Sequence, residues 1–195
     1  TIVDAGAQGE NFNKEFPMTT ITTLEQGLQS VGLKPDDVEQ VIVTHLHFDH
    51  IALANRYKNA TFIVQKRELE FARNPHVFNG VDYNKDFLKD LRFRIIDGDC
   101  EILPGIKVLL TPGHSPGGQS VQIQTPKGKA VITGFCSQMS TFTQTPFMKE
   151  KGLEVAACGL HTDCREVYDS AVRVKNIADI IIPVHDPMFM DIKSI

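Results

Sequence analysis

The 195-residue sequence predicts an α/β sandwich, because helical and strand-forming segments are mixed along the whole chain. Short apolar, β-branched runs typical of strands are interspersed with segments whose apolar residues recur at the helical period, and neither type forms a separate block. Three of the expected strands are followed directly by histidines. Because these strand ends come from distant parts of the chain, the histidines that follow them indicate one functional site and not unrelated histidines on the surface.

The first half of the chain is expected to begin with a strand and turn at 2–6. The abrupt start leads us to expect sequence before Thr1, so that the first strands of the fold are missing. Residues 7–19 lack a period and are expected to form a loop. Helices are expected at 20–31, ending at Gly32, at 65–73 and at 85–91, and a short helix is expected to start at 34–37. Strands are expected at 41–44 and 61–64.

The second half is richer in strand signals, and the chain as a whole (1–195) is expected to form a single domain. Pro126–Lys129 is expected to make a hairpin turn, and 135–160 is expected to be irregular. Within it, four apolar residues of 137–150 would either line an acyl pocket or pack under a loop: Met139, Phe142, Phe147 and Met148. The remaining elements are strands at 93–96, 101–103, 106–110, 119–124, 130–133 and 179–183, and a helix at 163–178.

The strongest chemical signal is the stretch Thr44–His50, which directly follows the apolar strand 41–43. In an extended segment, His45, His47 and Asp49 would share one side, and His50 would turn elsewhere. The spacing suits two adjacent metal ions, with the first two histidines on one ion and Asp49 with His50 on the other. Imidazole nitrogens and carboxylate oxygens are normal zinc or iron ligands, so the stretch predicts a hydrolytic di-metal centre.

The composition limits the classes of molecule that the protein is expected to bind. The net charge is −4, which argues against a nucleic-acid or anionic-membrane surface, and no apolar run reaches membrane-spanning length. No signal peptide opens the chain, and the four cysteines include no Cys-x-x-Cys pair, so a cytoplasmic location is expected. The expected partner is a small-molecule substrate, and a homodimer is left open as the alternative to a monomer.

The chain resembles the metallo-β-lactamase superfamily over nearly its whole length. Four segments match the motifs of that superfamily: Ile2–Gly6, the motif from His45 to His50, Thr111–Gly117 around His114, and Pro183–Pro187 around His185. Within the superfamily, the run from Thr111 to Ser120 is most similar to the N-acyl homoserine lactonase group. The resemblance implies an αβ/βα sandwich with two divalent metal ions at one rim, zinc with iron or manganese as alternatives. It further implies the ligand sets His45, His47, His114 and Asp49, His50, His185. His76, outside every motif, is expected to be a loop residue.

The sequence departs from the family pattern at the end of the strand 130–133. The family usually has a metal-bridging aspartate after Thr-Gly, and this chain has Phe135 there. The second metal should therefore bind more weakly unless another group replaces the carboxylate. Cys136 is one candidate, with a buried structural cysteine as the alternative reading. His161, expected near the N-cap of the helix 163–178 (Thr162 or Asp163), is the other, with a solvent-exposed position as its alternative. Gly118 stands where related lactonases tend to have a histidine, and Ile51-Ala52-Leu53 replace the usual glycines.

The function expected from these residues is metal-dependent hydrolysis of an ester or lactone. A metal-bound hydroxide would attack the carbonyl, and Asp49 would carry the proton to the leaving alkoxide. One alternative is a glyoxalase-II-like thioesterase, although that family has a helical domain after the last ligand and only ten residues follow His185. A nuclease fits less well because of the acidic charge. The third alternative is a non-hydrolytic binding or redox protein with one metal, because Phe135 has removed the bridging ligand.

Overall fold

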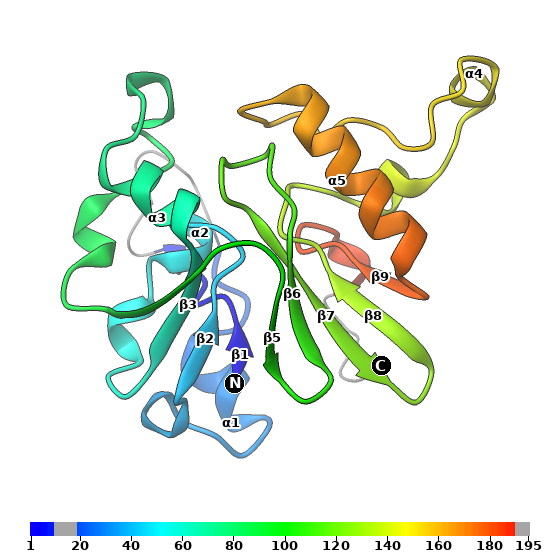
Figure 1. Cartoon of the computed structure of the whole chain (residues 1–195). Coiled ribbons are helices and arrows are strands. Elements are labelled where there is room, and N and C mark those ends of the chain that lie inside the picture. The colour runs from blue at the N-terminus through cyan, green and yellow to red at the C-terminus, as the bar shows by residue number, and fades with distance from the viewer. Residues whose placement is uncertain (10–18, 190–195) are drawn as a thin grey trace. The chain divides into compact units, whose positions relative to one another are not determined.

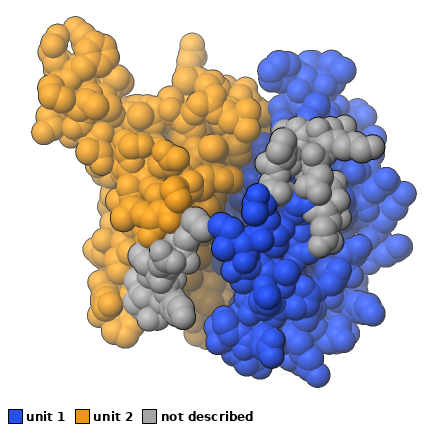
Figure 2. Space-filling model, turned by 180° about the vertical axis from the view of Figure 1, so that it is seen from behind, with its two compact units in different colours: residues 1–64, 69–96 blue, residues 65–68, 97–195 orange. Residues whose placement is uncertain are grey.

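The computed structural model describes residues 1–9 and 19–189 and confirms the mixed α/β class (Figure 1). The strands form a four-stranded sheet in the order β1-β2-β3-β4 and a five-stranded sheet in the order β5-β6-β7-β8-β9. The chain divides into two compact units (Figure 2): the first comprises 1–64 and 69–96, and the second comprises 65–68 and 97–195. Most of the loop expected at 7–19 lies outside the described residues.

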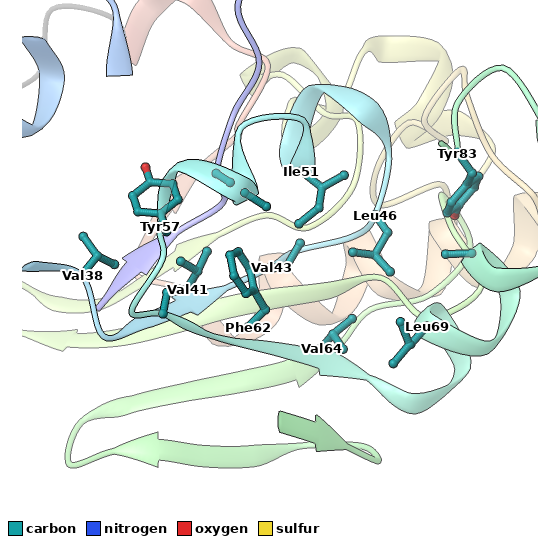
Figure 3. Packing of buried hydrophobic residues seen from close by; sticks show 14 of the residues in the cluster. Val38, Val41, Val43, Leu46, Ile51, Tyr57, Phe62, Val64, Leu69 and Tyr83 are labelled. Carbon is teal, nitrogen blue, oxygen red and sulfur yellow. The ribbon is translucent and has the colours of Figure 1, made fainter. Parts of the chain in front are cut away.

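The first unit contains the four-stranded sheet, whose second strand precedes the histidine-rich stretch. Strands β1 (Ile2–Val3), β2 (Gln40–Ile42) and β3 (Thr61–Gln65) are parallel, with Val41 opposite both Ile2 and Phe62. Buried apolar side chains from these strands and from the helices after them form its core, including Val41, Val43 and Phe62 (Figure 3). The other elements are α1 (Leu24–Gln29), α2 (Phe48–Ile51), α3 (Lys66–Arg73) and β4 (Arg92–Ile96).

The second unit is built on β5 (Cys100–Leu103), β6 (Ile106–Leu110), β7 (Gln119–Thr125), β8 (Gly128–Ile132) and β9 (Ile180–Ile182). The first four strands pair antiparallel in sequence order, and β9 adds parallel to β8. Helix α5 (Cys164–Ile177) packs its buried Val167, Ala171 and Val174 in a core with Val131 and Phe135. The expected helix 163–178 is therefore confirmed, and Asp163 is its N-cap, accepting from the backbone N–H groups of Arg165 and Glu166.

Three expected elements need correction. The helix expected at 20–31 is only Leu24–Gln29, because the Thr23–Gln26 capping box starts it late and because Ile21 and Val31, which suggested the longer period, are exposed. The apolar strand expected at 179–183 is shorter, Ile180–Ile182, and its three isoleucines are only half-buried. The stretch 135–160 was expected to be irregular, but it contains α4 (Pro146–Glu150).

The loop 137–150 does not gather its four apolar side chains into one pocket. Phe142 is buried, with its ring centroid 6.4 Å from that of Phe135, so its role is core packing. Phe147 on α4 is 62% exposed, and Met148 is buried. No helix in the described part of the chain is long and apolar enough to cross a membrane.

Candidate metal centre

The histidine-rich stretch changes conformation in its middle. His47 is extended (φ −68°, ψ 154°) and is the N-cap of α2, which begins at Phe48. The prediction that Asp49 continues an extended alternation with His45 and His47 is therefore wrong, because Asp49 and His50 lie in the first turn of a helix. An acidic residue is favoured there by the positive end of the helix dipole. The turn directs Asp49 and His50 differently from the two preceding histidines.

The first unit brings three of the predicted ligands together. One ligand atom from each of His45, Asp49 and His50 lies within 4.8 Å of the other two. The ring centroid of His45 is 3.9 Å from that of His50 and 4.5 Å from that of His47, and all three rings are buried. Imidazole and carboxylate donors at this spacing are a chemically suitable set for zinc or iron. The residues present therefore fit a divalent transition metal.

The carboxylate of Asp4 orients the His50 imidazole, a role that was not predicted from the sequence. Oδ2 of Asp4 lies 2.7 Å from Nδ1 of His50, and both Asp4 oxygens accept from Thr44, Oδ1 from its backbone N–H at 2.7 Å and Oδ2 from its hydroxyl at 2.9 Å. The Thr44 hydroxyl in turn lies 3.1 Å from Nδ1 of His45. A carboxylate behind a histidine fixes the ring and raises its basicity as a ligand. The signal for this role was an aspartate at the end of the expected first strand.

The environment of His50 favours its protonated form when no metal is bound. Burial alone would lower the pKa of His50, but the neighbouring charges and hydrogen bonds of Asp4 and Asp49 outweigh it and raise the pKa from 6.5 to about 10. This interaction stabilises the metal-free fold fully below pH 6.5, and the stabilisation is lost as the pH rises toward 10. Because a metal ligand must be a neutral imidazole, an ion that binds His50 must displace this proton.

We therefore expect metal binding at His50 to release about one proton at pH 7.5, and the apparent affinity to increase with pH up to about pH 10. Calorimetric titration with Zn²⁺ in two buffers of different ionisation enthalpy measures the proton count. Asp4→Asn should lower this count, because it removes the charge nearest to the imidazole. Proton release that is zero in the unmodified chain and unaffected by Asp4→Asn would contradict the assignment.

The second unit carries His114 on the loop between β6 and β7. Nδ1 of His114 lies 2.7 Å from the carbonyl oxygen of Leu160, and the loop is closed by a hydrogen bond from the backbone N–H of Thr111 to the carbonyl of Gly118. The buried carboxylate of Glu68 accepts from the N–H of Gly117 at 2.9 Å. These contacts fix the orientation of the His114 ring.

Close packing explains the glycine before His114. Gly113 has φ +114°, and a Cβ there would lie 2.0 Å from the backbone nitrogen of Val167 on α5. The Gly113 carbonyl also accepts from the backbone N–H groups of Thr162 and Asp163. The segment before α5 therefore lies against the His114 loop.

Two of the remaining predicted residues of the second unit lie at a cavity of about 400 Å³. Cys136 and His185 line it together with Cys158, Met148 and several serine and threonine hydroxyls. The backbone N–H of Met139 donates to Asp186, which ties the loop after β8 to the segment that carries His185. His161 is exposed, and its Nδ1 lies 2.7 Å from the carbonyl oxygen of Cys158. His76 is an exposed loop residue, as expected.

The predicted ligands are thus divided between the units. His45, His47, Asp49 and His50 belong to the first, and His114 and His185 belong to the second.

Comparison with known proteins supports the resemblance. The family model described as the metallo-beta-lactamase superfamily matches residues 1–182. An N-acyl homoserine lactonase of Bacillus cereus is 37% identical over 131 residues, which cover 65% of this chain and 48% of the relative. A lactonase of Azorhizobium caulinodans, AttM, is 38% identical over 113 residues, 54% of this chain and 43% of the relative. The chain thus spans less than half the length of these curated relatives.

Solved structures of N-acyl homoserine lactone hydrolases are also similar to this chain. A quorum-quenching N-acyl homoserine lactone hydrolase is 31% identical, with a TM-score of 0.75 over 97% of this chain and 76% of that chain. A second such hydrolase, solved with the product N-hexanoyl-L-homoserine at its catalytic metal centre, is 32% identical, with a TM-score of 0.71 over 97% and 78%. The metallo-β-lactamase fold expected from the sequence is confirmed by these matches.

Proposed function

Because the chain belongs to the metallo-β-lactamase superfamily, we propose that it is a metal-dependent hydrolase acting on an ester or lactone carbonyl. The observation that carries the proposal is the cluster of His45, Asp49 and His50, in which Asp4 orients the buried ring of His50. A lactone is the favoured substrate, since the similar proteins of known name are N-acyl homoserine lactonases.

The proposed ligand sets are those implied by the family. His45 and His47, with His114, would hold one ion, and Asp49 and His50, with His185, would hold the other. In support, one ligand atom from each of His45, Asp49 and His50 lies within 4.8 Å of the other two, and Nδ1 of His50 and of His114 contacts an oxygen acceptor that orients the ring. Divalent ions bound there would lower the pKa of a water molecule to about 7 and polarise the carbonyl.

Asp49 is the proposed proton carrier. Its side chain is partly exposed, whereas the three neighbouring histidines are buried, so the carboxylate is the member of the cluster that solvent and substrate can reach. Oδ2 of Asp49 lies 3.2 Å from Nε2 of His50 in the metal-free protein. A carboxylate beside the attacked carbonyl can take a proton from the nucleophile and deliver it to the leaving alkoxide.

The proposed second ion lacks the bridging carboxylate of the family, because Phe135 is fully buried in the core with Phe142 and supplies no donor. This observation favours a protein with one tightly held ion as the second candidate. Cys136 shares its cavity with His185, which supports Cys136 over the exposed His161 as the replacement ligand. Metal analysis of the purified chain separates a one-ion from a two-ion centre.

The function is tested with Asp49→Asn in the metal-loaded chain. The change keeps the side-chain shape but removes the charge and the proton carrier, so turnover of a lactone and ester panel should fall about 100-fold or more, while metal content falls less. Asp36→Asn, an exposed aspartate outside the motif, is the matched control and should keep both. Equal turnover in Asp49→Asn and the unmodified chain would exclude the proposed role, and hydrolysis of no panel member would exclude the function.

A further inference from the structure

The first unit contains a cavity of about 350 Å³ that is separate from the candidate metal centre. It is lined by parts of the segment 54–60, by Phe62 at the start of β3 and by the chain that enters β4. Because β2 and β3 are parallel, the start of β3 lies beside the start of β2, whereas His45 follows the end of β2. In Figure 3, Tyr57 of the cavity wall lies on the side of Val38, which precedes β2. The cavity and the predicted metal ligands are therefore at opposite ends of these strands.

Three cationic side chains line this cavity, those of Lys58, Lys89 and Arg92, and Asp90 supplies the single carboxylate among its lining residues. Within the described part of the chain, no ion pair joins a carboxylate to Lys58 or Arg92. Nζ of Lys89 lies 2.7 Å from Oδ1 of Asp86, but both side chains are largely exposed, and an exposed ion pair is weak. The cavity therefore has a surplus of positive charge, which favours an anionic ligand.

The backbone holds Arg92 against the wall of the cavity. Its Nη2 donates to the carbonyl oxygens of Lys58, at 3.2 Å, and of Ala60, at 3.4 Å. Phe93, the next residue of β4, packs on Phe62, with ring centroids 6.3 Å apart, so the start of the strand is fixed. A guanidinium has five N–H donors, and Nη1 and Nε of Arg92 have no acceptor among the described residues. These donors suit the oxygens of a phosphate or carboxylate group, which arginine binds in a fork.

The rest of the lining suits the hydroxyl groups of a ligand. The carboxylate of Asp90 can accept hydrogen bonds, and the side-chain amide of Asn55 can both donate and accept them. No hydrogen bond joins either side chain to another residue in the part of the chain that the structure describes. The backbone of Asp90 is left-handed, with φ +61°, a conformation that aspartate tolerates better than most residues. The cavity volume lies within the range of small-molecule sites, roughly 300–1,000 Å³.

We propose that this cavity binds a small phosphorylated sugar. The phosphate contacts Arg92, Lys58 and Lys89, and the sugar hydroxyl groups contact Asp90 and Asn55. A phosphate monoester carries a charge of about −1.5 to −2 at pH 7, so it offsets three cations better than a carboxylate does. A sugar without a phosphate would leave the cationic side chains without a partner. The inference does not depend on the proposed hydrolysis, because the cavity contains none of the predicted metal ligands.

The test is calorimetric titration of the metal-loaded full chain with ribose 5-phosphate, inorganic phosphate and ribose. Ribose 5-phosphate should bind with a Kd of about 1 mM or below, inorganic phosphate at least about threefold more weakly, and ribose without measurable affinity. Arg92→Gln should weaken the binding of ribose 5-phosphate at least about tenfold, because it removes the guanidinium. Arg94→Gln, an exposed arginine on the same strand but outside the lining, is the matched control and should retain the affinity. Lys58→Gln, at an exposed side chain, should weaken binding at least about threefold.

The absence of ribose 5-phosphate binding, or equal affinity in Arg92→Gln and Arg94→Gln, would overturn the inference. If Arg92→Gln does not fold, an unchanged affinity in Lys58→Gln has the same meaning. Equal affinities for inorganic phosphate and ribose 5-phosphate would overturn the assignment to a sugar. Because phosphate also binds metal ions, His45→Ala is titrated as well. Binding that is lost in His45→Ala and retained in Arg92→Gln would place the phosphate at the metal centre and contradict the proposal. Binding that is retained in His45→Ala and lost in Arg92→Gln would support the cavity, whether or not the chain hydrolyses a lactone.

Discussion

Replacing His45 with alanine is expected to remove bound metal and all hydrolysis. The side chain is fully buried, its ring centroid lies 4.5 Å from that of His47 and 3.9 Å from that of His50, and its Nδ1 is 3.1 Å from the Thr44 hydroxyl. Loss of a residue behind a ligand already costs about 10- to 100-fold in metal affinity, and loss of a ligand itself should cost more. Elemental analysis after purification without chelators measures the metal, and a lactone assay measures the activity.

The matched control is His76→Ala, which makes the same substitution at an exposed loop histidine. It should retain the full metal content, because the His76 side chain is exposed and its Nδ1 accepts from the backbone N–H of Phe78 in the same turn. Far-ultraviolet circular dichroism of both variants separates loss of ligand from loss of fold. If His45→Ala is folded and holds as much metal as the His76→Ala control, the assignment of the centre is wrong.

The centre could be located from sequence because its signal is local. The apolar run before Thr44 predicts a strand, and the abrupt change to three histidines and an aspartate marks its end. The position of the stretch after β2 agrees with that prediction. The four-residue helix α2 could not be seen, because a single turn has no apolar period and its N-cap, His47, makes no side-chain capping hydrogen bond.

Most of the features of the site that could not be predicted are contacts between residues far apart in the sequence. Asp4 and His50 are separated by 46 positions, and His114 and Leu160 by 46, and a period along the chain does not indicate such pairs. Helix α4 is different, because its signal was local: Thr145 accepts from the N–H of Met148, and Pro146 occupies the first turn. A stretch rich in threonine and proline was interpreted as irregular, although a cap followed by proline also indicates a helix start.

Phe135→Asp is expected to unfold or strongly destabilise the protein instead of restoring a second metal ion. The Phe135 side chain is 0% exposed and packs with Phe142 and the buried face of α5. Replacing a buried phenylalanine with a small residue costs about 3–5 kcal/mol, and an unpaired carboxylate in that cavity adds a desolvation cost. Since whole domains are stable by only about 5–15 kcal/mol, urea titration should show a large loss in the free energy of unfolding.

The matched control is Phe147→Asp, the same substitution on α4 at a side chain that is 62% exposed. Its ring is exposed and contacts Lys151 at the surface, so its free energy of unfolding should change by less than about 1 kcal/mol. The metal-to-protein ratio of both variants is measured on the folded fraction. A Phe135→Asp variant that is as stable as the control and binds one more equivalent of metal would place position 135 at the metal centre. That result would contradict its position in the core, because a carboxylate can bridge two ions only where its oxygens reach them.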